Sequence, residues 1–178
     1  MSWTTFPTLT DSQVLTGAHM QLVRDNLAET APAKASAAGQ IFVVTGANAI
    51  AARVPTNAIV ATNQPTTSTS YVNLATVGPS VTVTTGARAI VMPGSAVSNT
   101  GAGQVSYASY DVSSATTIAA DDARALVFES SGISQAVKAT AVYMETALTP
   151  GSNVFTMKYR CSGGTSSFSS RHLVVIPL

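Results

Sequence analysis

The chain has 178 residues, of which 46% are hydrophobic and 10% are charged, and its formal net charge is +1. This length is enough for one well-packed domain with an additional arm. The basic residues are scattered, so there is no basic stripe to bind nucleic acid, and no apolar run approaches the length of a membrane span. The opening residues lack the basic and apolar regions of a signal peptide, so we expect folding in a cytoplasm.

The first zone, residues 1–38, is expected to contain an apolar arm followed by a short helix. Thr10 or Asp11 can cap this helix and Pro32 ends it, while Gly17 lies inside it and lowers its propensity. A helix of this length cannot bury an apolar face alone, so it must pack on a copy of itself or on a partner protein. The apolar side chains expected to anchor the zone are Trp3, Phe6, Leu9, Leu15, Leu22 and Leu27.

The second zone, residues 39–65, predicts a β-hairpin followed by a linker that starts near residue 58. Two short apolar runs, 41–44 and 49–54, flank a turn that contains glycine and asparagine. The first run is apolar at four consecutive positions, so both of its faces require cover. An isolated hairpin is marginal in water, which favours a stalk made from several chains. The side chains expected in this stalk are Ile41, Phe42, Val43, Val44 and Ile50.

The third zone, residues 66–178, predicts an all-β head domain. Turn residues such as Pro93-Gly94 separate its runs, and a single helical turn is expected near residues 119–124. Eight strands at this spacing fit an eight-stranded jelly-roll sandwich, in which the last run, apolar on both faces, occupies a central position. The predicted strands are 71–77, 80–85, 88–92, 104–112, 126–129, 135–146, 153–161 and 170–176.

Residue types that carry chemistry are few and dispersed. His19 and His172 lie in different zones, and Cys161, the single cysteine, is expected to be a buried core thiol. Asp121-Asp122 has two interpretations, a weak calcium site completed by loop carbonyls or a solvated turn. We therefore expect no catalytic residue, no metal and no cofactor.

Three stretches resemble proteins of tailed bacteriophages. The opening, Trp3-Thr4-Thr5-Phe6-Pro7 onward to residue 27, resembles the N-terminal segment of many phage virion proteins. Residues 38–53 resemble a motif of phage fibres that commonly opens with Gly-Asp-Leu and ends in Arg-Leu-Pro; here Gln40 replaces the acidic residue, and Arg53-Val54-Pro55 keeps the ending. Residues 148–178 are similar to the closing strands of tumour-necrosis-factor-like jelly rolls on phage fibres and spikes.

This resemblance implies a homotrimer whose N-terminal part docks on the particle, through the major capsid protein or another virion protein, while its head faces outward. We expect a capsid decoration or head-spike protein on the capsid exterior, because the chain is short and has one head domain. The alternative is a short tail fibre that contacts host-surface glycans. The aromatic residues for that contact would be Tyr107, Tyr110 and Phe168, which otherwise would pack in the core or a trimer interface. Neither nucleic acid nor a membrane is expected as a partner.

Overall fold

The computed structural model describes residues 16–28, 30, 34–47, 49–132 and 135–178. The chain divides into two compact units, one ending at Val54 and the other beginning at Pro55. The predicted start of the head domain at residue 66 is therefore too late. Four of the expected anchor residues lie outside the described residues, namely Trp3, Phe6, Leu9 and Leu15.

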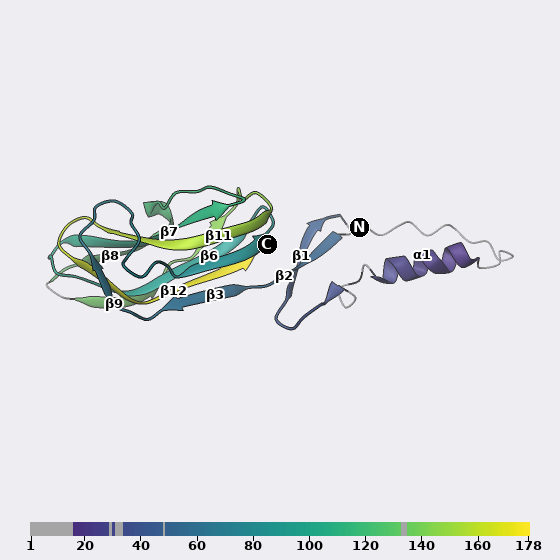
Figure 1. Ribbon diagram of the computed structural model, residues 1–178, viewed down its shortest axis with the longest axis horizontal. Helices are drawn as coiled ribbons and strands as arrows, with labels where there is room; N and C mark the ends of the chain where they lie inside the picture. The colour runs from purple at the N-terminus through teal and green to yellow at the C-terminus, as the bar shows by residue number, and fades with distance from the viewer. Residues whose placement is uncertain (1–15, 29, 31–33, 48, 133–134) are drawn as a thin grey trace. The chain divides into compact units, whose positions relative to one another are not determined.

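Helix α1, Gly17–Ala28, confirms the predicted N-terminal helix (Figure 1). Thr16 precedes it and acts as its cap. Its Oγ1 accepts a hydrogen bond from the His19 N–H, and its own N–H donates to His19 Nδ1, each over 3.3 Å. This reciprocal pair is a capping box in which histidine replaces the usual glutamate. Gly17 is thus the first helical residue and not an interior one; Thr10 and Asp11, the predicted caps, lie outside the described residues.

Strands β1 (Ile41–Gly46) and β2 (Ala49–Arg53) form the predicted antiparallel hairpin. Val44 lies opposite Ile50, and the register shifts between Val44 and Gly46, so a bulge precedes the turn. In the described part of the chain this sheet has two strands. Both of its outer edges therefore present unpaired backbone groups, and neither face is enclosed by a further strand.

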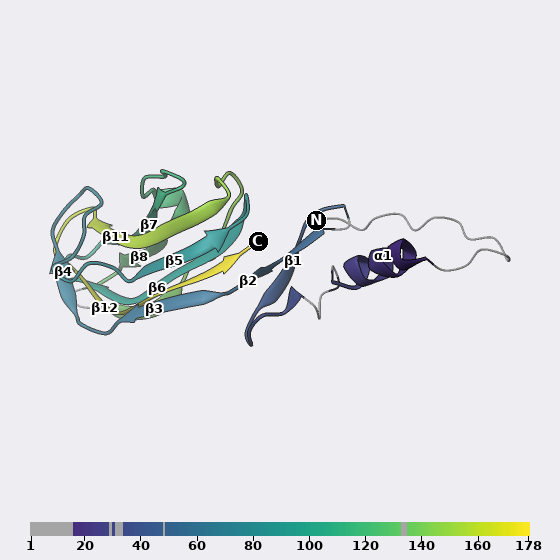
Figure 2. The same ribbon diagram turned by 45° about the vertical axis from the view of Figure 1, so that its right-hand side comes forward.

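The second unit is a sandwich of two antiparallel sheets (Figures 1 and 2). A short 3-10 helix, Asp122–Arg124, confirms the predicted helical turn between two of its strands. The first sheet contains β3 (Thr56–Val60), β4 (Gln64–Thr66), β6 (Ala89–Asn99), β9 (Ala136–Thr140), β10 (Tyr143–Glu145) and β12 (Ser166–Pro177). The second contains β5 (Ser80–Thr85), β7 (Gln104–Ser114), β8 (Leu126–Ser130) and β11 (Gly151–Cys161).

The strand order of these sheets is that of an eight-stranded jelly roll. Strands β3 and β4 pair successively with β12 and fill one edge of the first sheet, while β9 and β10 pair with β6 and fill the other. If β3 with β4 and β9 with β10 each count as one position, the chain has eight positions. The first sheet then has the order one, eight, three, six. The second, β5-β11-β7-β8, has the order two, seven, four, five. The predicted jelly roll is therefore confirmed, as is the central position of the last strand.

Alternate residues of the strands fill the space between the sheets. The valines of β5, Val81 and Val83, share the buried face, as their alternation with threonine predicts. Phe155, Met157 and Tyr159 of β11 are fully buried, and so is Cys161, which confirms the predicted core thiol. Because directly opposite residues of antiparallel strands point to the same face, the register fixes which side chains enter the core.

Two predictions about the start of the head domain are wrong. The predicted linker at residues 58–65 contains β3 and β4, which complete the edge of the first sheet beside β12. The predicted strand 71–77 is not a strand: a single bridge joins Val72 to Tyr159. This segment instead continues past the end of β5 along β11, where Cys161 N–H donates to the Ser68 carbonyl.

Two predicted strand limits inside the first sheet are also wrong. Strand β6 runs through Pro93-Gly94, which we expected to form a turn. The Pro93 carbonyl accepts from Ala141 N–H, which lies in the gap between β9 and β10. Proline has no N–H to donate, and it is tolerated here because the neighbouring strand is interrupted beside it. That interruption also divides the predicted strand 135–146 into two.

The revised boundary gives a direct test. A chain of residues 55–178 should unfold cooperatively, whereas one of residues 66–178 should be less stable by at least about 3 kcal/mol, because it loses the hydrogen bonds that β3 and most of β4 make to β12. Urea unfolding followed by circular dichroism measures the difference. Equal midpoints for the two chains would contradict the assignment of β3 to the sandwich.

Candidate functional site

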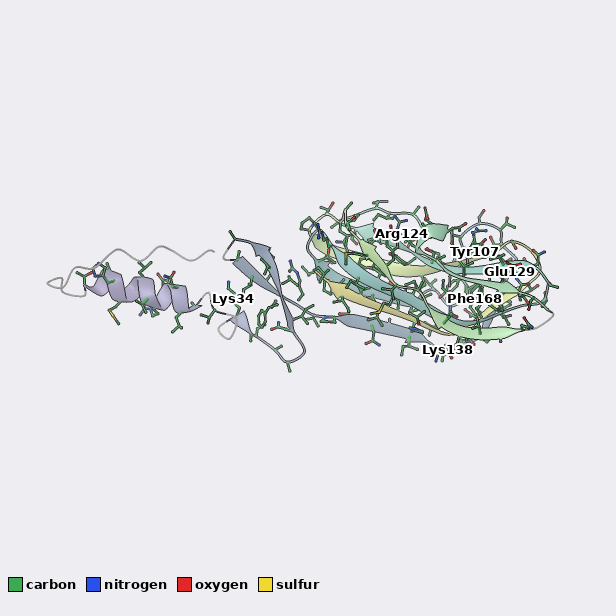
Figure 3. All side chains as sticks on the ribbon, turned by 180° about the vertical axis from the view of Figure 1, so that it is seen from behind. Lys34, Tyr107, Arg124, Glu129, Lys138 and Phe168 are labelled. Atoms are coloured by element: carbon green, nitrogen blue, oxygen red, sulfur yellow. The ribbon has the colours of Figure 1, made fainter. Side chains whose placement is uncertain are left out.

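Two of the three aromatic residues expected to contact glycans are in the core. Tyr110 and Phe168 are both fully buried, and Figure 3 shows Phe168 between the sheets. The Tyr110 ring packs on Phe155, with centroids 6.0 Å apart, and the Phe168 ring packs on Tyr159, with centroids 4.8 Å apart. Buried rings cannot stack on a sugar, so this prediction is wrong for both residues.

Tyr107, the third residue, lies on the outer face of the second sheet. It is directly opposite Arg160 of β11, whose guanidinium carbon is 3.6 Å from the centre of its ring. The cation covers one face of the ring, which is the surface that a sugar would use. Tyr107 therefore belongs to an interaction within the protein.

Asp122 joins this stacked pair to two loops. Arg160 donates from both Nε and Nη2 to its two carboxylate oxygens, and Tyr71 OH donates to Oδ1 over 2.8 Å. The hydrogen bonds from Arg160 hold the pKa of Asp122 below its ordinary value; burial, followed by the hydrogen bond to Asp122, raises the pKa of Tyr71. The cluster thus fastens the loops before β5 and β8 to the sheet.

The calcium interpretation of Asp121-Asp122 finds no support in this geometry. Both oxygens of Asp122 accept from Arg160, and Asp121 caps the 3-10 helix by accepting from Ala123 N–H. Among the described residues, no group of three or more His, Cys, Asp or Glu side chains could hold a metal ion. No described helix is long and apolar enough to cross a membrane.

A second charged cluster is buried inside the sandwich. Glu145 on β10 is 4% exposed, and its Oε1 lies 2.7 Å from Arg124 Nε and accepts from Tyr110 OH, also over 2.7 Å. Burial and this hydrogen bond raise the pKa of Tyr110 above its ordinary value. Arg124 also lies over the Tyr143 ring. Glu145 and Tyr110 are buried and Arg124 is mostly buried, which is typical of a structural ion pair.

Arg171 is fully buried without a carboxylate partner among the described residues. Its guanidinium donates to the carbonyls of Thr76 and Gly78 and to Gln64 Oε1, over 3.0 to 3.1 Å. These acceptors come from segments that precede β5, so Arg171 connects them to β12. Burying a cation in this way is unfavourable unless its donors are paired. Nη1 and Nη2 have these acceptors, whereas Nε has no hydrogen-bond partner among the described residues.

His172, the next residue, points to the opposite face of the same strand. Its ring lies across Gly94, where an added Cβ would be 2.2 Å from Nε2, and Nε2 is 2.9 Å from Thr140 Oγ1. His172 Nδ1 lies 3.3 Å from the Ser170 carbonyl. A carbonyl only accepts, so a hydrogen bond to Ser170 requires the N–H to be on Nδ1, and a ring with that tautomer can accept from the Thr140 hydroxyl through Nε2. These contacts give His172 an ordinary hydrogen-bonding role.

The first unit exposes several of its apolar side chains. Of the expected anchor residues in α1, Leu22 is half-buried and Leu27 is 63% exposed. Met20 and Val23, which sequence reasoning did not single out, are also exposed and lie on the Leu27 side of the helix, at spacings of three and four residues. In the expected stalk, Phe42 and Val44 are exposed whereas Ile41, Val43 and Ile50 are half-buried.

A further apolar surface, missed in the sequence, covers the outer side of the first sheet. Two cross-strand rows define it: Met144, Ile90 and Ile176 form one row, and Met92 and Val174 form the next. Ile59 of β3 lies beside them, opposite His172. We call the set Ile59, Ile90, Met92, Met144, Val174 and Ile176 the apolar face.

The depressed pKa of Asp122 predicts an acid-dependent loss of stability. Its contribution is present above the unfolded pKa of about 4 and is lost as the pH falls through the lower folded pKa. Between about pH 5 and pH 2, the urea midpoint of wild type should therefore fall more steeply than that of Asp122→Asn. Glu129→Gln is the control, because Glu129 is exposed and makes no ion pair in the described part of the chain; parallel curves for wild type and Asp122→Asn would contradict the assignment.

Comparisons with known proteins identify fold similarity only. No family model and no curated protein matches this sequence. Among solved structures, the VP2 subviral particle of infectious bursal disease virus is similar to 75% of this chain, with 16% identity and a TM-score of 0.40. The structure of the Gx strain of that virus is similar over the same share, with 13% identity and a TM-score of 0.38. This chain spans 36% and 35% of those two chains, and its assignment as a jelly roll rests on its own strand order.

Proposed function

We propose that this chain is a structural protein of a tailed-bacteriophage virion, a homotrimeric capsid decoration or head-spike protein. The N-terminal unit would dock on the major capsid protein or another virion protein, the hairpins of three chains would form a stalk, and the jelly roll would face outward. The observation that carries the proposal is the contrast between the two units: a closed sandwich follows an N-terminal unit in which several of the described apolar side chains are exposed.

The exposed side chains of the first unit support a role in assembly. Val44 is 81% exposed on a strand of the hairpin, and Leu27 is 63% exposed on α1. A helix of this length and a two-stranded sheet are each marginal in water without tertiary contacts. Contacts with other chains would supply the missing cover, and the resemblance to phage virion proteins covers these same segments.

The described head supports a structural role rather than catalysis. Two of its charged clusters, Arg160–Asp122 and Arg124–Glu145, are ion pairs that fasten loops or fill the core. The tail-fibre alternative depends on glycan contact, but Tyr110 and Phe168 are buried and Arg160 covers one face of Tyr107. We therefore favour decoration of the capsid over receptor binding.

The trimer is tested by the mass of the purified full chain. Light scattering at micromolar concentration should give three times the 18.1 kDa of one chain, because the apolar side chains of the first unit need cover that one chain does not provide. A stable monomer at this concentration would contradict the proposal, and a dimer would contradict its stoichiometry.

The anchor is tested by charges on the exposed side of α1. Val23→Glu/Leu27→Glu should reduce incorporation into phage particles at least tenfold, because it places carboxylates where apolar contact with the particle is expected. Gln21→Glu/Ala28→Glu adds the same charge at two exposed positions on a side of the helix away from Leu22 and Leu27, and should be incorporated normally. Copies per particle are counted by quantitative mass spectrometry, and a particle reconstruction shows their location. Full incorporation of the first variant, or density confined to the tail, would overturn this part of the proposal.

A further inference from the structure

The outer surfaces of the two sheets differ in chemistry. On the second sheet, the outward residues form ion pairs, with Lys158 Nζ 3.1 Å from Asp111 Oδ2 and Arg160 paired with Asp122. The rows of the apolar face contain isoleucine, valine and methionine and no charged residue. The outer surface of the second sheet is therefore suited to water, whereas the apolar face favours contact with another apolar surface.

The exposure of individual residues shows that the described residues of the second unit do not cover the apolar face. Ile59 is 67% exposed and Met144 is 47% exposed, although both belong to paired strands. Ile90, Met92, Val174 and Ile176, on the central strands between them, are each half-buried by their neighbours. Exposed or half-buried apolar residues thus occur on β3, β12, β6 and β10, and the layer of β3, β12 and β6 can be followed in Figures 1 and 2.

We propose that the apolar face is the surface through which the heads of neighbouring copies of this chain pack in the homotrimer. The inference rests on the trimer of the proposed function and not on its place in a virion. Contact between copies brings no like charges together across the rows of this face, since those rows carry none. Exposed Lys138 and Arg88 lie at its margins, outside these rows.

Chain connectivity favours a second copy over an unrelated partner. Strand β3, which contributes Ile59, follows the hairpin after only Val54 and Pro55, a span of about 10 Å at most. Three hairpins that meet in a stalk would therefore hold three β3 strands close to a common axis. The sheet that contains β3 is also the sheet that carries the apolar face.

Stoichiometry gives the same answer. The chain exposes apolar residues on α1, on the hairpin and on the head, as shown by Leu27, Val44 and Ile59. Copies of this chain can cover the last two at equal ratio through one symmetry operation. A different partner on the head would have to be present in the same number and would need a second interface besides the one between copies at the hairpin.

Cysteine accessibility tests the proposal on the full-length assembled chain. Cys161 is fully buried, so a surface cysteine would be the main reactive thiol. Ile59→Cys replaces a side chain that is 67% exposed in the single chain, and Val127→Cys, on the outer face of the second sheet, replaces one that is 50% exposed. If the apolar face is covered, a maleimide should label Ile59→Cys at least tenfold more slowly than Val127→Cys.

The outcomes separate this inference from the trimer itself. A trimer in which Ile59→Cys reacts as fast as Val127→Cys would overturn the inference and leave the proposed stalk intact, whereas a wild-type monomer would overturn both. Ile59→Lys/Met144→Lys gives an independent test: its trimer dissociation constant should rise at least 100-fold, against no change for the matched control Thr84→Lys/Val127→Lys on the other sheet. Circular dichroism confirms that each variant is folded, and equal dissociation constants for the two double variants would sink the proposal.

Discussion

Strand β12 is the element on which the rest of the head depends, because it has partner strands on both edges and packs one face into the core. It pairs with β3 and β4 on one side and with β6 on the other, and its inward residues Phe168, Leu173 and Val175 are fully buried. It is also the last strand of the unit, while β3 is the first. Pairing them closes a loop that contains nearly the whole domain, so much of the entropic cost of folding is compensated only when β12 is in place.

An irregularity in β12 places one polar residue on each face of this strand. The register shifts between Ser169 and His172, and Ser170 has a φ of 46°. This bulge directs Arg171 into the sandwich and His172 to the outer face. Inside, the buried guanidinium gathers carbonyls of the segments that precede β5; outside, the imidazole lies across Gly94. Without the bulge, Arg171 and His172 would each point to the opposite face of the strand. The local strain at Ser170 therefore has a structural purpose.

The period-two pattern predicted most strands and the jelly roll, since the alternation of Val81 and Val83 with threonine is visible in the sequence. It did not predict pairing between distant segments: β3 and β4 are short and polar in part, and become strands because β12 offers them an edge. Tyr107 and Tyr110 are separated by an odd number of positions, so one strand could not present both outward. Which of them is buried depends on the register with β11, which no local pattern contains. Similarly, Gly94 occupies a strand because His172, far along the chain, needs the space above it.

The few charged residues are distributed unequally between the outer surfaces of the two sheets. Ion pairs gather on the outer side of the second sheet, whereas the outer side of the first sheet carries isoleucine, valine and methionine. Apolar area left in water is unfavourable by about 25 cal/mol per Å². A chain that lived as a monomer would gain stability and solubility from charges at Ile59 or Met144, both already accessible. Their absence is easier to explain if those positions face a partner, where a single charge would be buried without compensation.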